Sequence, residues 1–415
     1  MKAHFIGGNT MALLRSGAEY FPALIAAIDA ATREIHLETY IFADDVTGRA
    51  VADALVRAAG RGVTVRVVID GFGSHEHIGE LGKTLERGGV GVAVFRPERG
   101  FFYFRKSRLR RMHRKICTFD ERVAFVGGIN IIDDLNMPAL QPGEKPYGPR
   151  FDYAVRVEGA LVNSILLTAR AMWARLNEDK RDRLKQVWSD ARANMFGDTR
   201  THRALRIAEA AIIDATASAG MHGDLTSAFV YRDNLMNRRE IEDCYLDAIA
   251  AAKTDILIAN AYFFPGRVFL RELNKAEARG VRVRLLLQGR KEYFLQHYAA
   301  RALYASLLNV GIEIYEYQAS FLHAKVAVID DAWATVGSSN IDPFSLLLAR
   351  EANVFVRDTA FVQSLRESLE RAIANDAQDI KPEHWRKRGF LDRMLSGLAY
   401  SVARGLMRVL GYGNR

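Results

Sequence analysis

The sequence predicts an α/β protein of two similar halves, each an α-β-α sandwich whose mixed sheet is mostly parallel. Residues 61–71 (RGVTVRVVIDG) and 279–289 (RGVRVRLLLQG) are identical at six of eleven positions without a gap. Residues 113–130 and 323–340 align over 18 positions, seven of them identical. Within each half, helical segments alternate with short apolar strands, which is the pattern of an α/β protein. A repeat of this length indicates a duplicated structural unit.

The elements follow the same order in both halves. Alanine-rich helical segments lead into apolar strands at residues 27–42 and 248–264. The next strand in each half is the RGV segment, and each 18-residue segment reads as a strand, a turn and a returning strand. Residues 170–245 carry many charges and few strand-forming residues, so we expect connecting helices there. The expected domains are a first repeat over 1–195, a second repeat over 196–380 and a tail over 381–415.

The length and composition indicate a globular protein of two domains. At 415 residues the chain exceeds the usual size of one domain. Hydrophobic residues make up 49% and charged residues 26% of the chain, as in ordinary globular proteins. Cys117 and Cys244 lack the CxxC spacing of disulfide or zinc frameworks, which fits a reducing compartment. The sequence has no run of 18 apolar residues and no signal-peptide pattern at its start, so we expect synthesis and retention in the cytoplasm.

Positive charge is concentrated in two places. The formal net charge is +9, residues 105–115 hold seven Lys or Arg and no acid, and residues 381–415 hold eight basic residues and two acids. Such clusters suit phosphate-bearing partners, either nucleic acid or anionic lipid headgroups; a solvated surface is the plainer alternative.

The first half carries eight extra residues between its repeated segments, because the repeat offsets are 218 and 210. We place them in residues 99–111 (RGFFYFRKSRLRR). Its four consecutive aromatics would be costly to expose to water, so we interpret this stretch as an amphiphilic rim that dips into a lipid surface. An ordinary surface loop is the alternative.

Each 18-residue segment begins with a histidine and a lysine two residues apart, His113 with Lys115 and His323 with Lys325. Side chains alternate along a strand, so both members of each pair lie on one face. A neutral histidine is a nucleophile and a charged one donates a proton, while the neighbouring lysine supplies a fixed positive charge. One His-x-Lys pair is weak evidence for a site, but two copies in register are strong evidence.

The returning strands end in the small-residue runs Gly127–Asn130 and Gly337–Asn340. Small residues there let Asn130, Ser339, Asn340 and backbone N–H groups approach a phosphate closely. Lysine is not a usual metal ligand, and the sequence has no zinc-type cluster, nucleophile elbow or P-loop. The pattern therefore favours phosphate chemistry without a metal or other cofactor.

The paired pattern H-x-K-x4-D-x6-G-[GS]-x-N resembles that of the phospholipase D superfamily, and the fuller match is to bacterial cardiolipin synthases of the B type. The segments that carry this resemblance are 7–14, 37–48, 111–130, 260–266 and 321–354. The resemblance covers nearly the whole chain. It implies a pseudo-dimer in which both motifs meet at one site on a pseudo-two-fold axis.

The resemblance also implies the chemistry of the site. One histidine attacks a phosphodiester and forms a phosphohistidine, while the other protonates the leaving alcohol and then deprotonates the incoming hydroxyl. The lysines and asparagines hold the non-bridging oxygens in place of a metal. The catalytic set carried over from the motif is His113, Lys115, Asp120, His323, Lys325 and Asp330, and the phosphate-binding set is Asn130, Ser339 and Asn340.

Four carboxylates need separate arguments. Asp120 and Asp330 belong to the family motif, but their spacing places them at strand ends, which favours a structural role. Glu351 matches an acidic position that the superfamily uses to orient a histidine. The first half has Gln141 at the same offset, so Asp152 is the candidate replacement.

The tail segment 390–411 has a helical period, with a basic face opposite an apolar stripe. The stripe consists of Phe390, Leu391, Met394, Leu395, Leu398, Val402, Leu406, Val409 and Leu410. We expect this helix to lie on an anionic lipid surface; packing against the domain is the alternative.

The resemblance implies cardiolipin synthesis, in which two phosphatidylglycerol molecules give cardiolipin and glycerol. A phosphodiesterase or nuclease of the same superfamily is the alternative, but the aromatic rim and the apolar tail stripe favour lipid over nucleic acid. A binding protein without activity is disfavoured because both motifs keep their polar residues. We expect an anionic phospholipid substrate, a membrane surface as partner, no nucleic acid and no obligate protein partner. The expected location is the cytoplasmic side of the inner membrane, with peripheral attachment.

Overall fold

The computed structural model describes residues 3–97, 110–137, 146–177, 225–233, 237, 239–342, 345, 348–387 and 389–409. Within them, fifteen strands form one continuous sheet. The strands of the first half are β1 (Ile6–Arg15), β2 (Glu34–Thr39), β3 (Thr64–Asp70), β4 (Gly91–Phe95), β5 (Lys115–Phe119), β6 (Val123–Gly127) and β7 (Tyr153–Gly159). Those of the second half are β8 (Leu225–Arg232), β9 (Asp255–Asn260), β10 (Arg282–Gln288), β11 (Glu313–Tyr317), β12 (Lys325–Ile329), β13 (Trp333–Gly337), β14 (Glu351–Arg357) and β15 (Ala377–Asp379).

The strand order has an internal two-fold symmetry. β1 and β8 pair with each other at the centre of the sheet, and Asn9 lies opposite Leu225. Outward from β1 the order is β7-β6-β5-β2-β3-β4, and outward from β8 it is β14-β13-β12-β9-β10-β11, with β15 added at the edge. This order supports the proposed division into two repeats, whose boundary at residue 195 lies outside the described residues.

The α/β class and the mixed sheet are confirmed, but the parallel share of the sheet is smaller than expected. In the described sheet, only β2-β3-β4 and β9-β10-β11 pair in parallel, and the remaining neighbours are antiparallel. The physical reason is the short turn after each motif, because a tight hairpin can join only antiparallel strands. The sequence also hid β8, which forms within residues 170–245, where connecting helices were expected.

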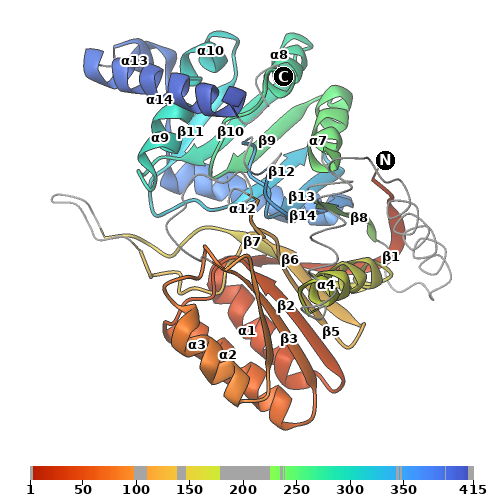
Figure 1. Ribbon diagram of the computed structural model, residues 1–415. Helices are drawn as coiled ribbons and strands as arrows, with labels where there is room; N and C mark the ends of the chain where they lie inside the picture. The colour runs from red at the N-terminus through yellow and green to blue at the C-terminus, as the bar shows by residue number, and fades with distance from the viewer. Residues whose placement is uncertain are drawn as a thin grey trace, which may run out of the picture.

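Helices cover both faces of the sheet in each half, as Figure 1 shows. In the first half, α1 (Ser16–Ala30), α2 (Val46–Gly60) and α3 (Ile78–Arg87) pack on one face and α4 (Leu161–Asn177) on the other. In the second half, one face carries α7 (Glu240–Ala251), α8 (Arg267–Ala278), α9 (Phe294–Arg301) and α10 (Tyr304–Asn309), and the other carries α12 (Thr359–Asp376).

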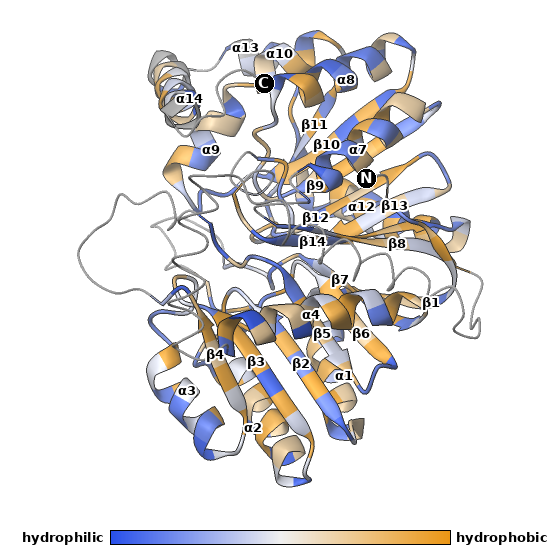
Figure 2. Cartoon of the chain, turned by 45° about the vertical axis from the view of Figure 1, so that its right-hand side comes forward, coloured by the Kyte–Doolittle hydropathy of each residue, from blue (hydrophilic) through white to orange (hydrophobic). Residues whose placement is uncertain are grey.

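The two halves share one apolar core beneath α4 and α12. Residues of both helices belong to the same buried cluster. In addition, α4 contacts β8 of the second half and α12 contacts β1 of the first half. Figure 2 shows the apolar residues concentrated along strands such as β2 and β3, with hydrophilic residues on the outer side of α3. The halves are therefore joined by their sheet and by their core.

The tail forms two helices, α13 (Pro382–Arg386) and α14 (Phe390–Val409). α14 packs against α9, and its Ser396, Ala399 and Ala403 are buried. Packing against the domain, the alternative reading of this segment, therefore holds for one face of the helix. A second row, Met394, Leu398 and Val402, stays exposed at 49%, 60% and 44%. None of the helices among the described residues is long and apolar enough to cross a bilayer.

Most of the expected aromatic rim, residues 98–109, lies outside the described residues, as does Gln141.

Candidate active site

Each motif histidine enters the site on a segment held by the opposite half. The backbone N–H of His113 donates to the carbonyl oxygen of Arg350 (2.9 Å). The N–H of His323 donates to the carbonyl oxygen of Phe151 (2.8 Å). Single parallel bridges join Met112 to Arg350 and Phe151 to Leu322. The two motifs, 210 residues apart in the chain, therefore meet where the halves join.

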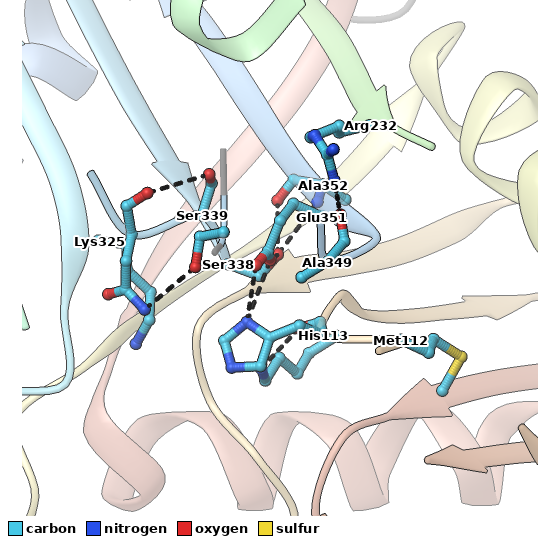
Figure 3. A network of polar contacts seen from close by, with 12 residues as sticks. Met112, His113, Arg232, Lys325, Ser338, Ser339, Ala349, Glu351 and Ala352 are labelled. Carbon is cyan, nitrogen blue, oxygen red and sulfur yellow. Dashed lines mark hydrogen bonds and ion pairs between the residues drawn. The ribbon is translucent and has the colours of Figure 1, made fainter. Parts of the chain in front are cut away.

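The carboxylates that orient the histidines are crossed between the halves. His113 Nδ1 lies 3.0 Å from Glu351 Oε1, and His323 Nδ1 lies 2.6 Å from Asp152 Oδ2. Figure 3 shows the His113 ring directed at Glu351, with Ser338 beside the same carboxylate. The sequence named both carboxylates but did not show that each serves the histidine of the other half.

Asp152 and Glu351 occupy equivalent positions in the duplicated fold. Asp152 immediately precedes β7, and Glu351 is the first residue of β14. Opposite Glu351, the Ser338 hydroxyl donates to Oε2 (2.5 Å). Opposite Asp152 the corresponding residue is Gly128, where an added Cβ would come within 2.4 Å of Asp152 Oδ1. The glycine leaves the space that the shorter carboxylate needs.

Both histidines are held in one tautomer. Burial lowers the pKa of His113 against the opposing charge of Glu351. Burial, followed by the charge of Lys325, holds the pKa of His323 well below its usual value. A carboxylate at this distance accepts a hydrogen bond from Nδ1–H, so the neutral ring carries its proton on Nδ1 and its lone pair on Nε2. Each Nε2 is therefore available to attack an electrophile or to receive a proton.

The two motif lysines lie buried beside the histidines. Lys115 Nζ donates to the carbonyl oxygen of His113 (2.6 Å), and Lys325 Nζ donates to that of His323. Lys325 Nζ is also 3.8 Å from Asp152 Oδ2. Burial lowers the pKa of Lys115 to about 7 and that of Lys325 to about 8. Such lysines gain strongly from an anionic ligand, because an added negative charge favours their protonated form.

The residues of the two small turns are also buried in the site. Asn130 Oδ1 accepts from the N–H of Ile41 (3.2 Å), and Asn340 Nδ2 lies 3.5 Å from Ser345 Oγ. Among the described residues, Asn340 Oδ1 has no hydrogen-bond partner. The Ser339 hydroxyl lies 3.4 Å from the carbonyl oxygen of Asn340. These polar groups line up with the histidines and lysines along the ends of β5, β6, β12 and β13.

Asp120 and Asp330 lie away from the motif histidines, in positions that suit the structural role expected from their spacing. Each follows the far end of the strand that begins with the motif lysine. Asp120 accepts hydrogen bonds from the N–H groups of Thr32 (2.7 Å) and Glu34 (2.9 Å). Asp330 accepts from Thr254 N–H (2.8 Å) in the same way. Five extended residues span roughly 17 Å, so neither carboxylate reaches a histidine.

Sequence reasoning missed Arg114 and Tyr40, which are neighbours of His113 in the chain and in space respectively. Arg114 forms a buried ion pair with Glu38, in which Nη2 lies 2.9 Å from Oε1. The ring of Tyr40 contacts the His113 ring edge-on at a centroid distance of 4.9 Å, and Lys115 Nζ lies 5.3 Å from the Tyr40 centroid. The alternation of side chains in H-R-K gave one usable signal, because it sends Arg114 to the opposite face from the two motif residues.

Comparisons with known proteins agree with this arrangement. A family model described as "Cardiolipin synthase, PLD-like domain" matches residues 24–135 and 245–373. Cardiolipin synthase B of Escherichia coli strain K12 is 37% identical over 422 residues, which cover 99% of this chain and 92% of the relative. A probable cardiolipin synthase of Bacillus subtilis is 28% identical, covering 94% of this chain and 71% of the relative.

A solved structure shows the same fold. The crystal structure of phosphatidylserine synthase from Haemophilus influenzae matches with a TM-score of 0.70 and 14% identity, covering 99% of this chain and 97% of that one. At this identity the likeness concerns the fold. Together with the sequence matches over nearly the full length, it places the chain in the cardiolipin synthase family of phospholipase D-like proteins.

Proposed function

We propose that this protein is a phosphatidyltransferase that joins two phosphatidylglycerol molecules into cardiolipin and releases glycerol. The observation that carries the proposal is the pair of crossed contacts, His113 with Glu351 and His323 with Asp152. They leave two Nε2 atoms free in one site, flanked by two buried lysines. A single site with two histidines suits a reaction that needs a nucleophile and a separate proton carrier.

In the first step, Nε2 of one histidine attacks the phosphorus of phosphatidylglycerol. The new bond is N–P, and the bond that breaks joins phosphorus to the glycerol headgroup oxygen. The negative charge of the bound phosphate favours a proton on Nε2 of the second histidine. That histidine gives its proton to the glycerol oxygen, so glycerol leaves as a neutral alcohol. The products are a phosphatidyl-histidine and one neutral histidine, which balances the proton and the charge.

In the second step, the neutral histidine takes the proton from a headgroup hydroxyl of a second phosphatidylglycerol. The oxygen attacks phosphorus, the N–P bond breaks, and cardiolipin forms. Both histidines then return to their starting states. Splitting the transfer in this way replaces one difficult displacement by two easier ones.

The cationic and amide groups stabilise the charge on the transferred phosphate. Lys115 comes from the first half and Lys325 from the second, and both are buried in the site. Their positive charges suit the non-bridging oxygens of the phosphate. Asn130 and Asn340 lie beside the lysines and supply amide N–H donors. In a buried site these interactions are stronger than in water.

The lipid substrate is supported by an apolar surface on the second half. Tyr293 and Phe294 at the start of α9 are exposed at 53% and 59%. α9 packs against α14, which carries the exposed row Met394, Leu398 and Val402. We propose that this surface, called the docking face below, attaches the protein peripherally to the cytoplasmic side of the inner membrane.

The decisive experiment uses vesicles of phosphatidylglycerol with a labelled headgroup, with and without EDTA. We expect labelled glycerol and cardiolipin in both conditions. His113→Ala and His323→Ala should each abolish both products, because each removes either the nucleophile or the proton carrier.

The matched control is His75→Ala, which removes an exposed histidine whose ring contacts only its own loop among the described residues. It should retain full activity. Phosphatidic acid without cardiolipin would identify a hydrolase, and dependence on a metal would contradict the proposed chemistry.

A further inference from the structure

Asp70 and Gln288 occupy equivalent positions in the two halves, at the last residues of β3 and β10. Asp70 Oδ2 accepts from the N–H of Met112 (2.9 Å), and Gln288 Oε1 accepts from the N–H of Leu322 (3.2 Å). Each donor immediately precedes a motif histidine. The contact is thus duplicated, but a carboxylate serves one half and an amide the other.

The two side chains differ in the hydrogen-bonding groups that remain without a partner. Asp70 Oδ1 accepts from the N–H groups of Phe72 (2.9 Å) and Gly73 (3.2 Å), so both oxygens are engaged. The N–H of Leu322 fixes the Gln288 oxygen, because only an acceptor can face a donor. The Gln288 amide nitrogen must then point elsewhere. It is buried and has no hydrogen-bond partner among the described residues.

Gln288 lines a small cavity in the second half, and its side chain also holds Leu322, the residue before His323. The cavity volume is about 20 Å³, which is enough for one water-sized group. The lining includes Ala261, Tyr262, Gln288, Glu292, Tyr293 and His297. Ala261 donates its N–H to the carbonyl oxygen of Ala324 (3.0 Å). Leu322 and Ala324, the chain neighbours of His323, are therefore both hydrogen-bonded to residues that line the cavity.

Glu292 supplies an acceptor in the same cavity. Its Oε2 accepts the hydroxyl of Tyr262 (2.6 Å), and its Oε1 lies 3.9 Å from an Arg150 nitrogen. A carboxylate has about four acceptor positions, so at least one remains for a ligand. Arg290 also lines the cavity, but its Nε donates to the carbonyl oxygen of Gln318 and its guanidinium lies over the Tyr147 ring. The carboxylate of Glu292 repels phosphate, so the cavity does not suit an anionic group.

A hydroxyl is the small group that fits both walls, because it accepts from the Gln288 amide and donates to Glu292. An ammonium could pair with Glu292, but it has no lone pair for the Gln288 donor. An alkyl group would leave both buried polar groups without partners.

We propose that this cavity is a headgroup subsite that binds the terminal hydroxyl of the phosphatidylglycerol headgroup and so selects glycerol over ethanolamine and alkyl headgroups. The inference rests on the proposed phosphatidyl transfer and specifies its substrate. At the equivalent position of the first half, the Asp70 carboxylate has no donor to offer.

The test compares release of the headgroup from phosphatidylglycerol, phosphatidylethanolamine and phosphatidylpropanol, each in the same mixed micelles. Gln288→Glu keeps the acceptor for Leu322 and removes the amide donor, and Glu292→Gln removes the carboxylate. Each variant should lower the preference for phosphatidylglycerol, expressed as a ratio of kcat/KM values, by about tenfold to a hundredfold. Gln363→Glu, on the exposed face of α12, is the matched control and should keep the ratio.

Headgroup release is measured whatever the second product is. A protein that forms only phosphatidic acid would refute the transfer but still report its headgroup preference. If cardiolipin forms and both Gln288→Glu and Glu292→Gln keep the wild-type ratio, the headgroup subsite is refuted. Glu292 is partly exposed, so its variant should fold even if Gln288→Glu does not; thermal melting of each variant checks this.

Discussion

Burial sets the charge states of the individual site residues. It is the largest influence on the pKa values of Lys115, Lys325 and Asp152, which become about 7, about 8 and about 6. Near neutral pH, Asp152 is ionised while the lysines are near the point of losing their protons. The site is therefore in its active charge state only within a limited pH range.

This predicts a bell-shaped dependence of kcat/KM on pH. Below about pH 6, Asp152 gains a proton and stops accepting from His323. Above pH 7 to 8, Lys115 and then Lys325 lose the charge that attracts phosphate. The profile of kcat/KM reports groups of the free enzyme. Steady-state rates between pH 5 and 9.5 on neutral detergent micelles measure it.

Asp152→Asn tests the assignment of the alkaline limb. The negative charge of Asp152 raises the pKa of Lys325, so its removal should move that limb to lower pH. A limb that stays in place would show that another group titrates there.

At the scale of single elements, the motif aspartates fix the edges of strands. Asp120 and Asp330 both have positive φ values, 51° and 46°, and each accepts several backbone N–H groups from the start of β2 or β9. Burial alone would raise the pKa of Asp330, but these hydrogen bonds outweigh it and lower the value. Their role is to lock the turn after the motif strand.

Asp330→Ala should therefore destabilise the fold without changing the chemistry. Losing the charged acceptor of these partly exposed backbone N–H groups should lower the free energy of unfolding by about 1–3 kcal/mol. Urea denaturation measures the loss, and kcat per folded molecule should stay near wild type. Because the folded-state pKa of Asp330 is lowered, its stabilising contribution is present above the unfolded-state pKa and is lost as pH falls through the folded-state value. A selective loss of kcat would place Asp330 in the reacting set.

The exposed row of α14 makes a prediction for the docking face. The triple variant Met394→Ser, Leu398→Ser, Val402→Ser should weaken binding to phosphatidylglycerol vesicles by about tenfold or more, since each side chain loses apolar area that the bilayer would bury. Vesicle sedimentation gives the binding constant. Val46→Ser, which alters an exposed side chain at the start of α2, is the comparison and should bind normally. Equal partitioning of the triple variant would exclude this row from the membrane contact.

At the scale of the whole molecule, each half supplies the carboxylate that orients the histidine of the other half. Glu351→Gln removes an acceptor from the second half and should disturb His113 in the first. Conversely, Asp152→Asn in the first half should disturb His323 in the second. Each should lower kcat by about tenfold to a hundredfold, the usual scale for loss of a histidine-orienting group.

Imidazole nitrogen NMR provides a measurement that a merely unfolded variant would not mimic. Glu351→Gln should shift the Nδ1 signal of His113 and leave that of His323 in place. Glu313→Gln, which removes an ion-paired carboxylate on β11, should change neither signal nor kcat. A shift at His323 alone in Glu351→Gln would mean that the pairs are not crossed in solution.

The sequence predicted the parts of the site that follow from local spacing. His113 and Lys115 are two residues apart on a strand, so their shared side is a local property, and the repeat supplied the second pair. The crossed contacts join residues 238 and 171 positions apart, and no local pattern encodes such a pairing. The same holds for β8, whose partners β1 and β14 lie far away in the chain.

Gln288 shows a different limit of sequence reasoning. Its place in the repeat was visible as the mismatch with Asp70, where IDG aligns with LQG. The unpartnered amide could not be foreseen, because it depends on which atoms of the second half surround it. A mismatch inside an otherwise regular repeat was the one available signal.

The crossed carboxylates also bear on how a duplicated protein evolves. A substitution that damages Asp152 harms the histidine of the other copy, so selection on either half acts through its neighbour. Two tandem copies arranged in this way cannot lose one motif and keep the other at work. Within the crossed pairs the carboxylate is kept although its length differs, whereas Asp70 and Gln288 differ in their chemistry. The duplication thus keeps one chemistry in both halves, while the side chains next to the motifs differ between the halves.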